Sequence, residues 1–91
     1  MSNAARIAIQ RRAALTRRAV ALLAREPAAP IADVDALLTD ACAAVLDLER
    51  PRVRIARERR MAELEHLREL IAELSARRRA YEAQTRPRRT A

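Results

Sequence analysis

Apolar residues return at helical intervals through the first part of the chain. At the 3.6-residue period of an α-helix they share one broad arc, which only Arg12 interrupts. The arc consists of Ala8, Ile9, Leu15, Ala19, Val20, Leu22 and Leu23. Most arginines of this stretch fall on the opposite face, which is the pattern of a basic amphipathic helix. The pattern predicts a helix over about residues 4–25, ended by the Pro27–Pro30 link.

A second apolar stripe follows that link and predicts a helix over about residues 31–49. The stripe consists of Ile31, Val34, Leu37, Leu38, Ala41, Val45 and Leu48. Pro30 suits a helix start, and Asp33 suits the positive end of the helix dipole. Asp33, Asp40 and Asp47 recur every seven residues on the opposite face, which we expect to be solvated or paired with arginine. Cys42 lies at the edge of the stripe and is expected to be a core thiol.

Pro51 should end or kink the second helix, and a third helix is predicted over about residues 52–84. Its apolar positions follow the 3-4-3 spacing of a coiled-coil seam formed by Leu64, Leu67, Ile71 and Leu74. In the same frame, Arg57 and Arg60 occupy earlier seam positions, where an apolar residue would stabilise more. Because burying Arg without a partner is costly, these two side chains should face a carboxylate, solvent or a ligand.

The links between the predicted helices are short, so neighbouring helices should pack antiparallel. The expected fold is therefore an all-α hairpin or bundle with a long, coiled-coil-like C-terminal helix. Residues 1–84 would form one domain, and residues 85–91, which carry three arginines and Pro87, would be a disordered basic tail. The chain contains no Gly, which argues against phosphate-cradling loops and tight hairpins.

The apolar residues are small for a chain of this length, which limits the hydrophobic core. The chain has 22 alanines and 11 leucines but no Phe or Trp. Alanine buries little area, so self-association or a partner should complete the core. We expect a homo-oligomer, with a dimer favoured. The seam of the third helix could close that dimer, or it could be the intramolecular core of a three-helix packing, and both alternatives stay open.

Charge comes in blocks of alternating sign. The 19 basic residues are all arginine and face 12 acidic residues, for a formal charge of +7. Residues 1–30, 50–60 and 77–91 each carry +5, residues 31–49 carry −5, and residues 61–76 carry −3. Blocks of opposite sign can neutralise one another inside the fold or across a dimer. The remaining positive charge indicates an acidic partner.

Arginine makes bidentate contacts to phosphates and carboxylates, so the Arg-rich faces supply the candidate binding residues. The candidates are Arg6, Arg11, Arg17, Arg18, Arg25, Arg52, Arg54, Arg57, Arg59, Arg60, Arg77, Arg78 and Arg79. The simpler interpretation is that each group pairs with an acidic block or is solvated. A single aromatic residue disfavours single strands, whose bases stack on aromatic rings. Duplex DNA bound through its phosphates is the favoured partner, with the protein acting as an accessory or regulatory factor.

A protein-binding adaptor or inhibitor is the second hypothesis. Leu15 and Leu22, on the apolar face of the first helix, would dock into a partner, with arginines assisting orientation. Self-association would use the third-helix seam of Leu64, Leu67, Ile71 and Leu74. A weaker third hypothesis lays the first helix on an anionic membrane surface.

Enzyme chemistry is poorly supported, because no nucleophile has a base and an orienting group in the pattern. The chain has one histidine, His66, and one cysteine, Cys42, which is too few for a typical metal site. We therefore expect His66 to be solvated and no metal to be bound. The glutamates around His66 read most simply as a polar helix face, formed by Glu63, Glu65, Glu69 and Glu73. The expected protein is non-enzymatic, without cofactor or small-molecule substrate. No apolar run approaches a membrane span, and the cytoplasm is the default compartment.

Overall fold

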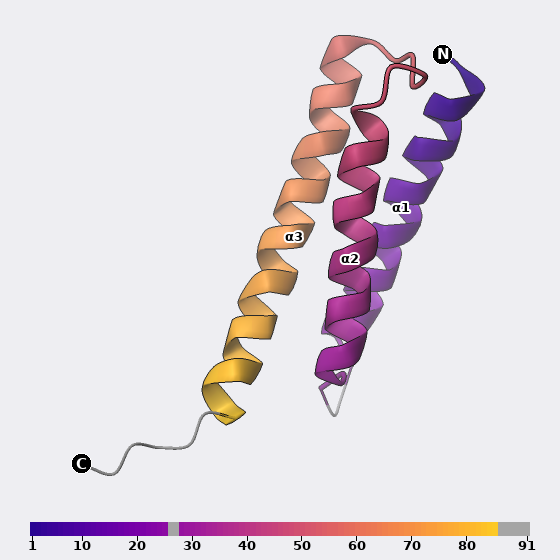
Figure 1. Ribbon diagram of the computed structural model, residues 1–91. Coiled ribbons are helices and arrows are strands. Elements are labelled where there is room, and N and C mark those ends of the chain that lie inside the picture. Colours follow the sequence, from indigo (N-terminus) through magenta and orange to yellow (C-terminus); the bar gives the residue numbers. More distant parts are fainter. Residues whose placement is uncertain (26–27, 86–91) are drawn as a thin grey trace.

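A computed structural model describes residues 1–25 and 28–85 and shows three helices packed side by side (Figure 1). They are α1 (Asn3–Leu23), α2 (Ile31–Leu48) and α3 (Arg57–Thr85). In the view of Figure 1 the chain runs down, up and down again, and α2 packs against both of its neighbours. The prediction of an all-α bundle with a long C-terminal helix is confirmed. The predicted basic tail begins inside α3, at Thr85, and residues 86–91 lie outside the described part of the chain.

The third helix begins at Arg57, so the predicted start at residue 52 is wrong. Pro51 cannot donate a backbone hydrogen bond, and the chain turns here, with the Val53 amide donating to the Arg50 carbonyl at 3.0 Å. The Val53 side chain is buried in the core cluster. Arg60 Nη2 donates to the Val53 carbonyl at 2.5 Å and ties the turn to α3. A buried valine at the end of the bundle therefore takes the place of a further helical turn.

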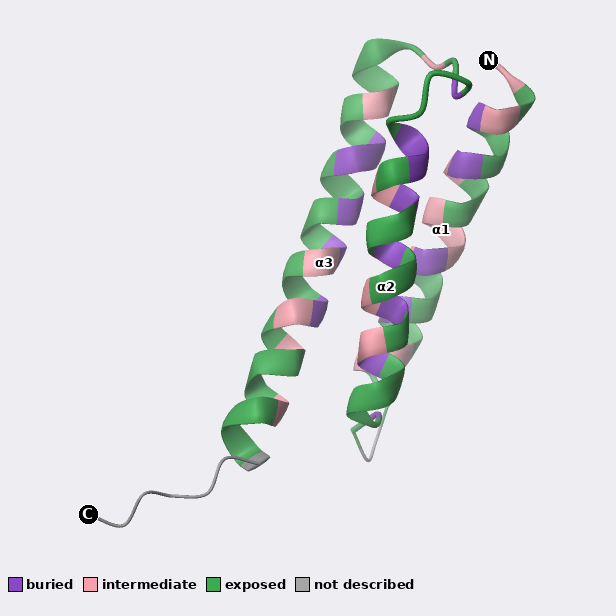
Figure 2. Cartoon of the chain, viewed as in Figure 1, coloured by how far each residue is buried: buried purple, intermediate pink, exposed green. Residues whose placement is uncertain are grey.

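Each helix turns one apolar row inward, as the buried stripes in Figure 2 show. The helical rows are Ala5, Ala8, Leu15 and Ala19 in α1, Val34, Leu37, Ala41, Ala44 and Leu48 in α2, and Leu64, Leu67, Leu70 and Leu74 in α3. The rows of α1 and α2 are rich in alanine, and α3 supplies four of the seven buried leucines in the described part of the chain. The predicted seam of α3 is thus used inside the chain, with Ile71 half-buried against it.

Three predicted core positions lie outside the core. Ile31 was placed on the apolar stripe of the second helix, yet it is 40% exposed, because it is the first residue of α2 and lies at the end of the bundle. Val20 was placed on the apolar arc of the first helix, yet it is 66% exposed. The inward row of α1 is narrow, because alanine dominates it, and Val20 points away from that row one residue after buried Ala19. Cys42, expected to be a core thiol, is exposed, because it follows buried Ala41 and lies on the flank of α2.

A ladder of ion pairs joins α1 to α2. Arg11, Arg18 and Arg25 recur every seven residues on α1, and the three heptad-spaced aspartates of α2 meet them in reverse order. The pairs are Arg11–Asp47 at 3.5 Å, Arg18–Asp40 at 2.9 Å and Arg25–Asp33 at 3.2 Å. The two exposed pairs, Arg18–Asp40 and Arg25–Asp33, contribute about 0.2–1 kcal/mol each, so they set the antiparallel register more than the stability. Of the two alternatives expected for the aspartate face, solvation or pairing with arginine, the structure shows pairing with arginine.

Candidate acidic-partner surface

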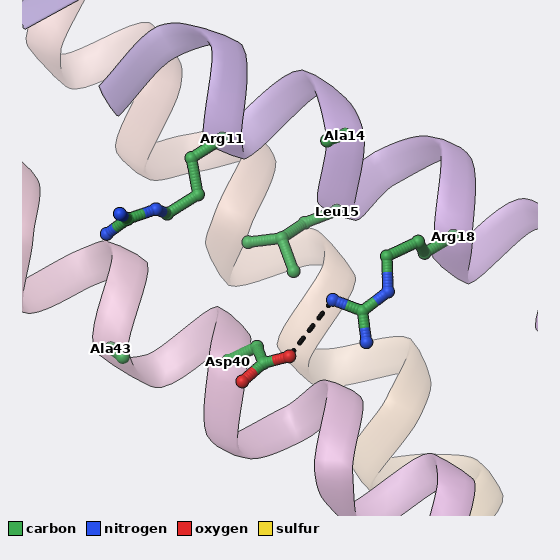
Figure 3. Close-up of a pocket in the computed structure, with 6 residues that line it drawn as sticks. All are labelled: Arg11, Ala14, Leu15, Arg18, Asp40 and Ala43. Carbon is green, nitrogen blue, oxygen red and sulfur yellow. Dashed lines mark hydrogen bonds and ion pairs between the residues drawn. The ribbon is translucent and has the colours of Figure 1, made fainter. Parts of the chain in front are cut away.

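Most of the candidate arginines are engaged within the chain. Figure 3 shows Arg11 and Arg18 reaching from α1 across a shallow groove towards α2, with Arg18 on Asp40. On the other side of the bundle, Arg78 contacts Asp35 at 2.7 Å and Glu82 at 3.8 Å. The guanidinium of Arg77 donates to the Leu23 carbonyl at 3.5 Å. These side chains hold the helices together, and a phosphate would have to compete with their present partners.

Asp47 gathers three guanidinium groups at the C-terminal end of α2. Asp47 is only 8% exposed. Its carboxylate oxygens lie 3.5 Å from the guanidinium of Arg11, 3.7 Å from that of Arg50 and 3.0 Å from that of Arg52. One negative charge therefore faces three positive charges, each more than half exposed. The cluster stays net positive and opens to solvent on the arginine side. Arg50 was absent from the candidate residues, although it precedes Pro51 in the same basic block.

A buried ion pair joins α1 to α3. Arg12, the residue that interrupts the apolar arc, forms a salt bridge with Glu63, whose carboxylate also accepts from Arg59 Nε at 3.1 Å. Glu63 is 2% exposed, so its assignment to the polar face of α3 is wrong. Burial raises the pKa of Glu63, but hydrogen bonds and charge from Arg12 and Arg59 outweigh this and hold the pKa below its ordinary value of 4.5. Glu63 therefore stays ionised and fastens the two helices.

Five candidate arginines have no hydrogen-bonding or ion-pairing partner for their side chains within residues 1–25 and 28–85. They are Arg6, Arg17, Arg54, Arg57 and Arg79. Arg57, which was expected to face a carboxylate, solvent or a ligand, is exposed to solvent. Arg60, the other seam arginine, bonds a backbone carbonyl instead, and its buried Nε has no partner among the described residues. The free guanidinium groups are thus fewer than the sequence suggested.

Three of the five lie at the same end of the bundle, where α1 begins and the α2–α3 turn passes (Figure 1). Ser2 joins these segments: its hydroxyl accepts from the Ala5 amide that opens α1 and from the Arg54 amide, both at 3.1 Å. The Ser2 amide donates to the Arg54 carbonyl at 3.2 Å. Arg6 therefore lies one helical turn beyond Ser2 in α1. Arg54 lies in the α2–α3 turn, and Arg57 is the first residue of α3. We call residues 1–12 and 47–63 the basic end.

The charge of the basic end is strongly unbalanced. It holds nine arginines against four carboxylates, namely Asp47, Glu49, Glu58 and Glu63. The opposite end, counted over residues 19–25, 28–40 and 71–85, holds four arginines against five carboxylates. Within the described part of the chain, positive charge is therefore concentrated at one end of the bundle. The charge blocks of the sequence did not show this concentration of charge, because the antiparallel packing of α2 places carboxylates beside some arginines and not beside others.

The apolar candidates lie mainly inside the bundle. Leu15, Leu64, Leu67 and Leu74 are buried, and Leu22 and Ile71 are half-buried against the core. The apolar face of the first helix is therefore largely covered by the other helices, and Leu22 is left at a shallow pocket that it lines with Leu37. Self-association remains a prediction, and in this conformation it needs a different surface.

The described residues, 1–25 and 28–85, do not form a metal site. No group of three or more His, Cys, Asp or Glu side chains among them could hold a metal ion, and His66 is exposed. Within the same ranges, no helix has both the length and the apolar content to cross a bilayer. No protein-family model matches this chain, and no curated protein or solved structure shows significant similarity to it.

Proposed function

We propose that this chain is a non-enzymatic interaction protein that binds duplex DNA through its basic end. The observation that carries the proposal is the excess of five positive charges at that end, combined with three arginines that have no partner among the described residues. Guanidinium groups suit phosphate oxygens, which they contact in a bidentate manner. Such contacts release counterions, so the binding would be strong at low salt and independent of base sequence.

The fold favours phosphate contact over base stacking. Tyr81 is the only aromatic residue of the chain, and its hydroxyl donates to the Ala29 carbonyl at the end opposite the basic end. A stacking platform for single strands therefore does not lie beside the free arginines. Arg6 on α1 and Arg54 in the α2–α3 turn instead present charges from segments that Ser2 holds together, and Arg57 adds another at the start of α3. A rigid basic surface of this kind suits the regularly spaced phosphates of a duplex.

Removing the three free arginines of the basic end should weaken DNA binding without unfolding the protein. We expect R6A/R54A/R57A to bind a labelled random duplex at least about tenfold more weakly at low salt, and to lower the slope of log K against log salt by up to about 2.7, as expected for three lost phosphate contacts. Fluorescence anisotropy over a range of about 50–300 mM salt measures both quantities.

The matched control removes the same charge elsewhere. Arg17, Arg68 and Arg79 are exposed and also have no bonded partner within residues 1–25 and 28–85, but they lie outside the basic end. R17A/R68A/R79A should keep most of the affinity and of the salt slope, and circular dichroism should show both variants to be as helical as the parent protein. An equal loss in both variants would mean that only net charge matters. Absence of binding by the parent protein at low salt would refute the proposal.

A further inference from the structure

A small pocket at the basic end lies between the start of α1 and the guanidinium groups that surround Asp47. The residues that line it are Asn3, Ala4, Ile7, Arg11, Asp47 and Arg52. Its volume is about 260 Å³, below the range of about 300–1,000 Å³ that is usual for drug-sized ligands. We call it the Asp47 pocket, and its size suits a small charged group.

The arginines around Asp47 keep most of their hydrogen-bond donors free. Only Arg52 donates a hydrogen bond to the carboxylate, from Nη2 to Oδ1 at 3.0 Å. Arg11 and Arg50 approach it at 3.5 Å and 3.7 Å as ion pairs, and neither guanidinium group donates a hydrogen bond within residues 1–25 and 28–85. Because a guanidinium group carries five N–H donors, these side chains can still donate to a ligand with several acceptor oxygens.

The net charge of this cluster favours a dianion. Three guanidinium groups face the single carboxylate of Asp47, which leaves two positive charges uncompensated. The arginine side chains are more than half exposed and that of Asp47 is 12% exposed, so a ligand arriving from solvent meets the guanidinium groups first. A phosphodiester of the DNA backbone carries one negative charge, whereas a phosphate monoester carries about −1.5 to −2 at pH 7 and has three acceptor oxygens. The monoester therefore matches both the charge and the free donors of the cluster.

The start of α1 adds to the site that the guanidinium groups form. Ser2 accepts the amides of Ala5 and Arg6, whereas the amides of Asn3 and Ala4 have no acceptor among the described residues. The first turn of α1 carries no acidic residue. Free amides at the positive end of a helix dipole favour a bound anion.

From the charge of the cluster and its free donors, we propose that the Asp47 pocket binds a phosphate monoester in its dianionic form. Arg11 contacts the phosphate oxygens from α1, Arg52 contacts them from the α2–α3 turn, and Asp47 holds the two guanidinium groups in place. Two sources supply this chemistry: the 5′-phosphate at the end of a duplex, and a small phosphate compound. The first source rests on the proposed function and would place the protein at DNA ends, and the second does not depend on it.

Titration with inorganic phosphate tests the pocket without DNA. We expect the amide signals of Asn3 and Ala4 and the Nε–H signal of Arg11 to shift saturably in nitrogen–proton NMR spectra, with a Kd of about 1 mM or less at neutral pH and constant ionic strength. R11A should weaken this binding at least about tenfold. R18A is the matched control, because Arg18 is also an exposed arginine of the α1 ladder, at 54% against 53%, but faces Asp40 as its single partner. R18A should leave the binding unchanged.

Short blunt duplexes with 5′-phosphate or 5′-hydroxyl ends distinguish the two sources. We expect the phosphorylated duplex to bind about tenfold more tightly by fluorescence anisotropy, and R11A to abolish this preference. R6A/R54A/R57A should bind both duplexes more weakly and keep the preference, since it leaves the Asp47 pocket intact.

The two proposals can fail separately. Phosphate shifts without any duplex binding would refute the proposed function and support the pocket. Phosphate shifts with duplex binding but no preference for 5′-phosphate would support the pocket and assign it to a small phosphate compound. Absence of saturable shifts with inorganic phosphate, or equal effects of R11A and R18A, would overturn the phosphate site whether or not the duplex binds.

Discussion

Replacing Glu63 by Ala should lower the free energy of unfolding by about 3–5 kcal/mol, the usual cost of leaving a buried charge without its partner. The side chain of Arg12 is only 17% exposed, so water cannot fully replace the lost carboxylate. Arg59, which is 52% exposed, can be hydrated when Glu63 is removed. The loss should therefore come mainly from Arg12, and urea denaturation followed by circular dichroism measures it.

The double variant R12L/E63L separates the cost of an orphaned charge from the value of the ion pair. Replacing both members of a buried pair by apolar residues is often neutral or stabilising, by up to about 4 kcal/mol. We therefore expect R12L/E63L to be at least as stable as the parent protein. R59A should cost about 1 kcal/mol or less, because Arg59 is more than half exposed and Glu63 keeps its salt bridge to Arg12. If the double variant loses as much as E63A, the site is needed for its shape and the ionic explanation is wrong.

The pH dependence gives a second measurement on Glu63. Its pKa is lower in the folded chain than its ordinary value of 4.5, because the charge and hydrogen bonds of Arg12 and Arg59 outweigh burial. A lowered pKa stabilises the fold above the pKa of the unfolded chain, and this stabilisation is lost as pH falls through the folded pKa. Stability should thus begin to fall below about pH 4.5. This part of the pH dependence should vanish in E63Q.

Spacing along the sequence predicted the parts of the fold that depend on local periodicity. The three helices, the 3-4-3 seam of α3 and the heptad of Asp33, Asp40 and Asp47 follow from the side chains each helix brings to one face. The sequence also contains the matching heptad of Arg11, Arg18 and Arg25, but its pairing depends on how α1 and α2 are aligned. Antiparallel register is a tertiary property, so the ladder could be recognised only once the helices were placed.

The candidate site was harder to predict, because tertiary packing decides which group each arginine contacts. Arg12 gave one usable signal: it interrupts an apolar row, and a buried arginine requires a carboxylate. Nothing in the local pattern singled out Glu63 from the exposed Glu65, Glu69 and Glu73 on the same helix. The late start of α3 depends in the same way on Val53 finding a place in the core. Local propensity gave the elements, and packing decided which charges remained free.

Replacing Leu67 by Ala should lower the free energy of unfolding by about 2–5 kcal/mol, through lost burial and the cavity left behind. Leu67 is fully buried, at 0% exposure, in the seam of α3, where it faces the alanine-rich rows of α1 and α2. Small neighbours cannot move inward to fill the space, which places the expected loss in the upper half of that range. Thermal and urea denaturation at several protein concentrations measure it.

Concentration dependence decides between the two roles left open for the seam. If Leu67 serves the intramolecular core, the midpoint of unfolding and the loss in L67A stay the same at every protein concentration. A dimer closed by the seam would instead raise the midpoint with concentration, because association stabilises the folded state by mass action. L46A is the matched control, since Leu46 is 63% exposed and its truncation should change stability by about 0.5 kcal/mol or less. Because the fold already buries Leu64, Leu67 and Leu74 within one chain, we expect the concentration-independent result, and any dimer must form through another surface.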